Sequence, residues 1–150
     1  MTHPEDTWKC LMGRNIFDHL DARLMIIQPQ YDTFVLTHRL GIDCLTDGES
    51  KKTLKECEPA EIILMDALRM VLITQAFKKA VSLGTSVWSN ACVWHSALPQ
   101  SDIYYSDKQR ASVGGLKLTA QEAVERFVFD GETIVEIDAY PWPYNAECAF

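Results

Sequence analysis

The spacing of apolar residues predicts helices in the first half of the chain. Between residues 4 and 25, apolar side chains recur at steps of three and four positions, which is the period of an amphipathic helix. Residues 26–44 fit two structures, either a helix that starts after Pro29 and ends at Gly41 or a strand over Thr33–Thr37. We favour the helix.

Residues 59–83 have the clearest helical pattern. Pro59 suits the first turn of this helix and Gly84 suits its end, while apolar residues surround most of its circumference. A helix that is apolar on most sides is expected to be central, with other elements covering more than one face. Polar residues 46–52 predict a loop before it.

The second half of the chain predicts strands. Residues 86–95 alternate in a way that indicates a strand buried on both sides, or nearly so. Further on, the pair Asp130-Gly131 stands between two β-rich runs, within the segment 127–140. An Asp-Gly pair in this setting is the strongest short-range signal for a β-hairpin.

One stretch before this hairpin supports two interpretations. Thr119–Glu122 matches a capping box, which would start a short helix. The alternative is one long strand over Leu116–Phe129. We predict a strand at least from Val124, because the hairpin needs a partner for residues 132–139.

The order of these elements predicts the fold class. Helices come first and an antiparallel sheet comes last, which indicates an α+β fold with N-terminal helices packed on a C-terminal antiparallel β-sheet. A chain of 150 residues is the length of one typical domain. We therefore expect a single globular domain over residues 1–150.

The negative charge gathers at the C-terminal end. The formal net charge is −7, and residues 122–150 hold seven acidic residues against one basic residue, Arg126. Such a surface repels a phosphate backbone, so direct nucleic-acid binding is disfavoured, and it attracts a protein partner with a basic surface. Solubility alone is the commoner reason for an acidic surface.

Cysteine usage and the termini predict a cytoplasmic location. The five cysteines are widely spaced and form no Cys-x-x-Cys motif, which is typical of free thiols in a reducing compartment. The first residues lack the basic start and apolar core of a signal peptide. No apolar run reaches the roughly 18 residues of a membrane span, so we expect no membrane association.

The predicted hairpin would bring acidic residues together. With Asp130 and Gly131 at the turn, Glu125 lies opposite Glu136, and Asp138 follows on the same face. Facing carboxylates repel one another, so they would bind a cation or a basic partner. We rank first the alternative that this face is only solvated, or that a bulged turn shifts the register and removes the pairing.

A short aromatic segment follows the hairpin. Two prolines hold Tyr140, Trp142 and Tyr144 in a rigid extended stretch, which could serve as a docking strip. The slightly favoured alternative is that these rings fold back and cover the edge of the core.

The histidines do not predict a metal or nucleophilic site. The four histidines are scattered and form no His-Glu-x-x-His motif. Cys92 and His95 face opposite sides of the predicted strand, which is poor geometry for a nucleophile and its base. We expect no metal and no cofactor.

The segment 127–140, with an aromatic strand, an Asp-Gly turn and an Ile-Val-Glu strand, resembles the closing hairpin of the nuclear-transport-factor-two-like superfamily. This superfamily includes ketosteroid isomerases and polyketide cyclases. The resemblance implies a curved antiparallel sheet wrapped around helices into a cone with an internal pocket. It covers about a tenth of the chain, and no catalytic acid or base of the family aligns with this sequence.

Two functions follow from these features. The favoured one is a non-catalytic acidic binding domain, an inhibitor or adaptor that presents carboxylates to the basic surface of a protein partner. A second copy of the chain is a further candidate partner. The predicted binding residues are those of the acidic face and the aromatic strip, namely Glu125, Glu136, Asp138, Tyr140, Trp142 and Tyr144.

The second function is a small pocket-containing enzyme or ligand-binding protein of the cone-shaped superfamily. It would do acid–base chemistry on an apolar small molecule. Asp102, Glu125 and Glu136 are the candidate acids and bases, and Tyr104 or Tyr105 would donate a hydrogen bond. This function requires an apolar cavity of at least roughly 300 Å³ that contains a carboxyl group.

Overall fold

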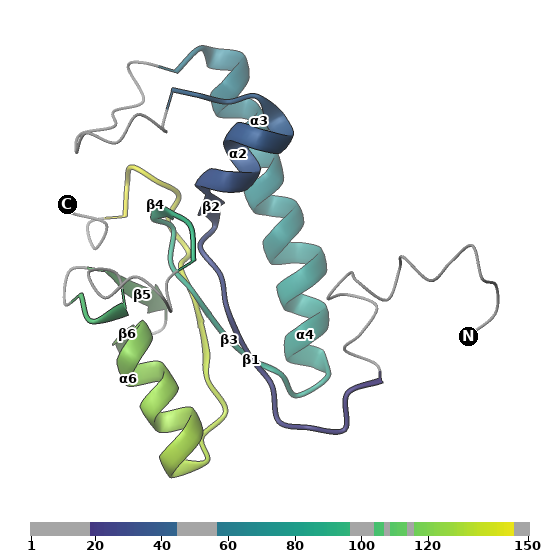
Figure 1. Cartoon of the computed structure of the whole chain (residues 1–150), viewed down its shortest axis with the longest axis vertical. Helices are drawn as coiled ribbons and strands as arrows, with labels where there is room; N and C mark the ends of the chain where they lie inside the picture. Colours follow the sequence, from purple (N-terminus) through teal and green to yellow (C-terminus); the bar gives the residue numbers. More distant parts are fainter. Residues whose placement is uncertain (1–18, 45–56, 97–103, 107–108, 114–115, 146–150) are drawn as a thin grey trace, which may run out of the picture.

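A computed structural model describes residues 19–44, 57–96, 104–106, 109–113 and 116–145 of the chain (Figure 1). Its main sheet has three strands in the order β1-β3-β7. They are β1 (Met25–Ile27), β3 (Ser86–Ser89) and β7 (Val135–Ile137), and both pairings are parallel. The carboxyl ends of all three strands therefore lie at the same edge of the sheet.

A second parallel pair continues from this edge. Strand β2 (Tyr31–Asp32) pairs with strand β4 (Val93–Trp94). Between the two pairs, the backbone N–H of Gln28 donates to Trp88 at 3.2 Å and that of Gln30 donates to Asn90 at 2.9 Å. The two chain segments therefore stay side by side from residue 25 to residue 32.

Helix α2 (Thr33–Leu40) starts directly after β2 and ends at Gly41, as the favoured interpretation predicted. The backbone of Gly41 has φ 67°, in the left-handed region that glycine adopts without a steric penalty. The start of the chain differs from the prediction. Residues 1–18 lie outside the described residues, and the described part of the predicted first helix leads into strand β1 instead.

The helix predicted at 59–83 is confirmed. It consists of α3 (Pro59–Val71), a π-helical stretch η4 (Leu72–Phe77) and α4 (Lys78–Ser82). It is less covered than predicted, because four of its apolar residues are exposed on α3, with Ile63 at 70%. The other three are Leu64, Met70 and Val71. The loop predicted at 46–52 lies outside the described residues.

The predicted C-terminal hairpin is wrong. Strands β5 (Arg110–Val113) and β6 (Leu116–Thr119) form an antiparallel pair, and a helix follows them: α6 (Ala120–Glu125) and the π-helical η5 (Arg126–Asp130). The capping box at Thr119 and Glu122 starts this helix. Gly131, with φ 71°, ends it, so the Asp-Gly pair serves as a helix C-terminus rather than a hairpin turn.

The sheet lies between two layers of helix. Figure 1 shows α3 and α4 on one side of the strands and α6 on the other. Alternate residues of β3 pack on these layers, since Val87 belongs to a cluster with Phe77 and Ala80, while Trp88 belongs to the larger cluster that contains Leu118. The indole N–H of Trp88 donates to the backbone oxygen of Leu118 at 2.9 Å.

The predicted fold class is therefore confirmed only in its coarse form. Helices and strands both contribute to the core, but the main sheet is parallel rather than antiparallel. A cone-shaped sheet is not confirmed. Among the helices that the structure describes, none combines the length and apolar character of a membrane span.

A buried polar network joins the carboxyl end of the sheet to α3. The guanidinium of Arg69 donates to the side-chain oxygen of Gln30 at 2.6 Å and to the backbone oxygen of Ala139 at 2.9 Å. The carboxylate of Asp138 accepts from the backbone N–H of Ala91 at 2.9 Å and from the side chain of Asn145. These bonds hold three strand ends and one helix together.

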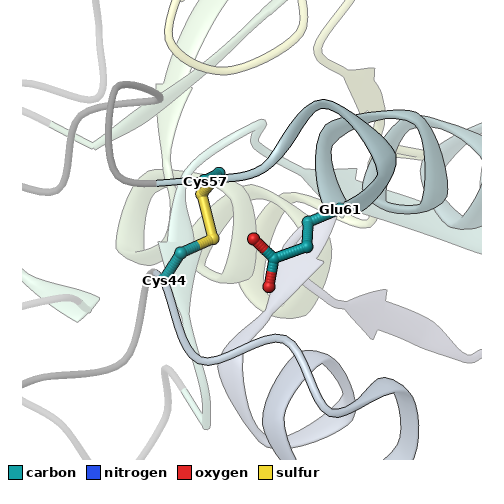
Figure 2. A group of neighbouring side chains, drawn as sticks. All are labelled: Cys44, Cys57 and Glu61. Carbon is teal, nitrogen blue, oxygen red and sulfur yellow. A yellow bond between two sulfur atoms is a disulfide. The ribbon is translucent and has the colours of Figure 1, made fainter.

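A disulfide closes the region between α2 and α3. Cys44 and Cys57 are bonded to each other (Figure 2). Cys92 is also disulfide-bonded. The prediction of free thiols is therefore wrong for these three cysteines, and the other two lie outside the described residues. The Cys44–Cys57 bond bridges 13 sequence positions, so it restricts the unfolded chain and fixes the start of α3 beside the end of α2.

Replacing both Cys44 and Cys57 by serine should lower the free energy of unfolding by about 3 kcal/mol, because the unfolded chain gains loop entropy. Equilibrium unfolding in guanidinium chloride measures this change. Substitution is preferable to a reducing agent, since reduction also opens the disulfide of Cys92. An unchanged unfolding midpoint in the double variant would show that the disulfide contributes nothing.

Candidate active site

Asp32 occupies the junction of β2 and α2, where its carboxylate caps the helix. Oδ1 accepts from the backbone N–H groups of Phe34 at 2.9 Å and Val35 at 3.2 Å. Oδ2 accepts from the side-chain amide of Gln28 at 2.9 Å. These donors and the positive end of the helix dipole stabilise a negative charge at a fixed position.

His95 lies beside this carboxylate because of strand register. Asp32 pairs with Trp94 in the parallel ladder, and His95 is the next residue after β4. Its Nδ1 lies 2.9 Å from Oδ1 and 3.1 Å from Oδ2 of Asp32. A carboxylate can only accept, so this bond places the imidazole proton on Nδ1 and leaves the lone pair of the neutral ring on Nε2.

The surroundings of the imidazole restrict it further. The ring of Phe34 stacks against that of His95, with centroids 5.3 Å apart and planes 27° apart. Ser96, the next residue, has φ 61°, a left-handed conformation that is rare for a residue with a side chain. The side chain of His95 is 45% exposed, whereas that of Asp32 is nearly covered. The pair thus has an inner carboxylate and an outer imidazole.

Tyr31, beside Asp32, anchors the strand from its other side. Its buried hydroxyl donates to Oδ1 of Asp66 on α3 at 3.0 Å, and the backbone of Trp142 hydrogen-bonds to the phenol oxygen. Burial, together with the charge of Asp66, raises the pKa of Tyr31 well above its ordinary value of 10.0. This tether holds β2 against α3 and so fixes the residue that follows.

The strand that carries His95 is held in the same way. Trp94 donates its indole N–H to the side-chain oxygen of Asn90 at 3.0 Å, and Asn90 in turn accepts the backbone N–H of Gln30. The bond from Ala91 to Asp138 fixes the bend between β3 and β4. Both sides of the Asp32–His95 pair therefore rest on buried hydrogen bonds.

The structure separates the predicted acidic face. Glu125 lies at the end of α6, where it accepts from the side chain of Gln121 at 2.8 Å. Glu136 lies on β7 and Asp138 just after it, with exposed fractions of only 6% and 1%. The predicted pairing of Glu125 with Glu136 is wrong because Glu125 is helical, and two of the three acids are buried rather than presented to a partner.

The three aromatic residues of the predicted docking strip lie in different environments. Trp142 folds back into the core cluster, as the favoured alternative predicted. Tyr140 and Tyr144 are exposed. The strip therefore does not present three rings on one surface.

The cavity found among the described residues differs from the predicted pocket. A cavity of about 380 Å³ lies at the amino-terminal ends of β1 and β3, the opposite end of the sheet from Asp32 and His95. Its lining includes the charged residues Asp21 and Arg23, so it is not the apolar pocket that the cone-shaped fold implies. Of the other candidates, Asp102 lies outside the described residues, and Tyr104 packs edge-on against Tyr105.

One further group has the composition of a metal site. The sulfur atoms of Cys44 and Cys57 and the carboxylate of Glu61 lie within 4.8 Å of one another (Figure 2). The two sulfurs are bonded to each other, and the carboxylate accepts from the backbone N–H of Glu58 at 2.8 Å as part of the α3 capping box. The group therefore has a structural role at the start of α3.

Sequence reasoning missed the Asp32–His95 pair, although signals for both residues were present. Asp32 follows a short apolar run, Met25–Ile27, and His95 follows the buried run that was predicted as a strand. In a parallel sheet such residues meet at the carboxyl edge. The predicted helix 4–25 and the ambiguous segment 26–44 divide this apolar run, so the pattern does not predict a strand or a parallel edge here.

Comparison with protein families places the chain in a known family. The model of a family described as pectinacetylesterase matches residues 1–149, and no curated protein matches the chain. The resemblance to the nuclear-transport-factor-two-like superfamily is therefore wrong, and residues 127–140, which suggested it, form no hairpin. The same match overturns both predicted functions, the non-catalytic inhibitor or adaptor and the cone-fold enzyme.

Replacing Tyr31 by phenylalanine should destabilise the fold by about 1–3 kcal/mol at pH 7, because a buried hydrogen bond to a carboxylate is lost. The raised pKa of Tyr31 adds a pH dependence. Above about pH 10 an unfolded tyrosine loses its proton before the folded one, so the contribution of Tyr31 is complete below that pH and declines as pH rises.

Urea unfolding of both proteins between pH 7 and pH 11 measures this contribution. The difference in unfolding free energy should stay constant up to about pH 9 and then shrink. A difference that stays constant up to pH 11 would contradict the buried, charge-coupled environment of this hydroxyl.

Proposed function

The chain belongs to the pectinacetylesterase family, and on this basis we propose that it acts in the hydrolysis of carboxylic esters, with acetyl groups on pectin as the substrate class. His95 is the general base and acid of the reaction, and Asp32 is the carboxylate that orients it. The hydrogen bond between His95 Nδ1 and Asp32 is the observation that carries this assignment.

The arrangement of the two residues supports proton transfer at Nε2. A nucleophilic hydroxyl adds to the ester carbonyl carbon while its proton passes to Nε2 of His95. When the bond between the carbonyl carbon and the sugar oxygen breaks, Nε2 returns the proton to the departing alcohol. Water as the nucleophile releases acetate directly. With a side-chain hydroxyl as the nucleophile, water then repeats both steps on the acyl-enzyme, which releases acetate and restores the side-chain hydroxyl. Asp32 stabilises the imidazolium that exists between these steps and keeps the ring in the tautomer that can accept at Nε2.

The position of the pair in the fold gives further support. Asp32 ends strand β2 and His95 follows its parallel partner β4, so both lie at the carboxyl edge of the pair, which is where α/β folds place their reactive groups. Asp32 also precedes His95 in the chain, the order of these two roles in α/β-hydrolases. In those enzymes a Gly-x-Ser-x-Gly turn carries the nucleophile. The 150-residue sequence contains no such motif, so the proposal assigns the base and its carboxylate.

The disulfides bear on where the protein acts. Cys44, Cys57 and Cys92 are all disulfide-bonded, and such bonds persist in oxidising environments. We propose an oxidising compartment or the cell exterior in place of the predicted cytoplasmic location. An extracellular polysaccharide ester is a substrate that a protein in this setting would meet.

The test compares the chain with its His95→Ala and Asp32→Asn variants. Acetate release from acetylated pectin and p-nitrophenol release from p-nitrophenyl acetate give the two rates. Loss of the base should lower kcat/KM by about 10²- to 10⁴-fold. Asp32→Asn should lower it by at least about 10²-fold, because a neutral amide does not stabilise the imidazolium, and its NH2 group, at the position of Oδ2, donates toward Nδ1 and favours the wrong tautomer.

His19→Ala is the matched control, since His19 is an exposed histidine that precedes β1. Its rates should equal those of the unmodified chain. Circular dichroism verifies that each variant is folded. Equal activity in His95→Ala and His19→Ala, or no ester hydrolysis by the folded unmodified chain, would remove the proposal.

A further inference from the structure

The ring of Phe34 is the aromatic partner of the His95 imidazole. Phe34 lies two residues after Asp32, in the first turn of α2. Its ring stacks on His95 at 5.3 Å between centroids, while Asp32 holds the edge of the same imidazole at Nδ1. The histidine is therefore contacted on one edge by a carboxylate and on one face by an aromatic ring.

The contacts of Nδ1 with the two carboxylate oxygens of Asp32 restrict where Nδ1 lies. A tilt of the ring plane that keeps Nδ1 within hydrogen-bonding distance is resisted by contacts on the ring face. Such a tilt moves Nε2, on the far side of the ring, and changes the direction of its lone pair. The ring of Phe34 stacks on the imidazole, so this contact restricts the tilt of the ring plane.

Phe34 is 46% exposed, and both its backbone and its ring make a further contact at this site. Its backbone N–H donates to Oδ1 of Asp32 at 2.9 Å, the same oxygen that accepts from His95. Its ring also contacts that of His38, one helical turn later, with centroids 4.7 Å apart. The carboxylate thus fixes the backbone of Phe34, and the ring of Phe34 contacts the rings of two histidines, His38 and His95.

We propose that Phe34 is a positioning residue, which holds the plane of the His95 ring so that Nε2 points toward the ester. The proposal rests on the function assigned above to His95. It adds that ring stacking by a nonpolar residue, as well as the carboxylate, sets the geometry of proton transfer. A misoriented base lowers the rate of the chemical step without changing how the substrate binds.

The test uses Phe34→Leu, which keeps an apolar side chain but removes the aromatic ring, and Phe34→Tyr, which keeps the ring. The first readout needs no activity. In NMR spectra, the ring-current shift of the His95 ring protons should disappear in Phe34→Leu and persist in Phe34→Tyr. The ¹⁵N shifts of the imidazole should continue to report a proton on Nδ1 in both, because Asp32 is unchanged.

The second readout is kinetic. Phe34→Leu should lower kcat for p-nitrophenyl acetate by about 2- to 10-fold with KM unchanged, the range expected for losing one aromatic contact. Phe34→Tyr should restore kcat. Arg39→Ala is the control on the same helix, an exposed residue in the last turn of α2, and it should leave kcat unchanged.

These outcomes separate the two proposals. An inactive unmodified chain that still shows the Phe34-dependent ring-current shift would overturn the proposed function and leave the stacked geometry in place. Identical His95 proton shifts in Phe34→Leu and in the unmodified chain would overturn the positioning role. An equal fall in kcat for Phe34→Leu and Phe34→Tyr would also overturn it, since the loss would then not depend on the aromatic ring.

Discussion

The parallel pairing of Tyr31–Asp32 with Val93–Trp94 is the constraint on which the candidate site depends. It brings Asp32 and His95, 63 positions apart in the chain, to the same edge of the molecule. A shift of one residue in this register would turn His95 to the opposite face and break the pair. Two residues per strand form too few ladder hydrogen bonds to secure such a register. The side chains around the ladder must therefore supply the rest.

That support is polar and buried. Arg69 places its guanidinium on the side chain of Gln30 and on two backbone oxygens after β7, so the desolvation cost of the cation is offset by fixed acceptors. Asp138 holds the bend before β4, and Tyr31 ties β2 to α3. A buried network of this kind loses more than one bond when any member is removed, because the remaining partners are left unsatisfied. The position of the exposed imidazole is in this way determined by groups deep in the fold.

The sequence was informative where structure is local. The helix at 59–83 and the end of α2 at Gly41 follow from apolar spacing and from glycine's access to positive φ. The Asp130-Gly131 pair was ambiguous in the same local terms, because glycine ends helices as well as forming hairpin turns. The capping box at Thr119 decides between these roles, and it starts a helix. Strand β1 is only three residues long, so neither its existence nor its parallel partner could be inferred from periodicity, and the Asp32–His95 pair was missed with it.

Asp32 couples the fold to the chemistry. Its Oδ1 accepts two backbone N–H groups of α2 and the imidazole N–H, so the same charge caps a helix and orients a base. The helix N-terminus and the carboxylate attract one another, and the same carboxylate lies where the imidazolium formed during proton transfer needs a counter-charge. Helix capping thus prepares the electrostatic environment before any substrate binds. Phe34 lies in the first turn of α2, after the N-cap Asp32, and its ring stacks on His95. The N-terminal end of α2 therefore supplies both the charge and the aromatic contact that set the direction of Nε2.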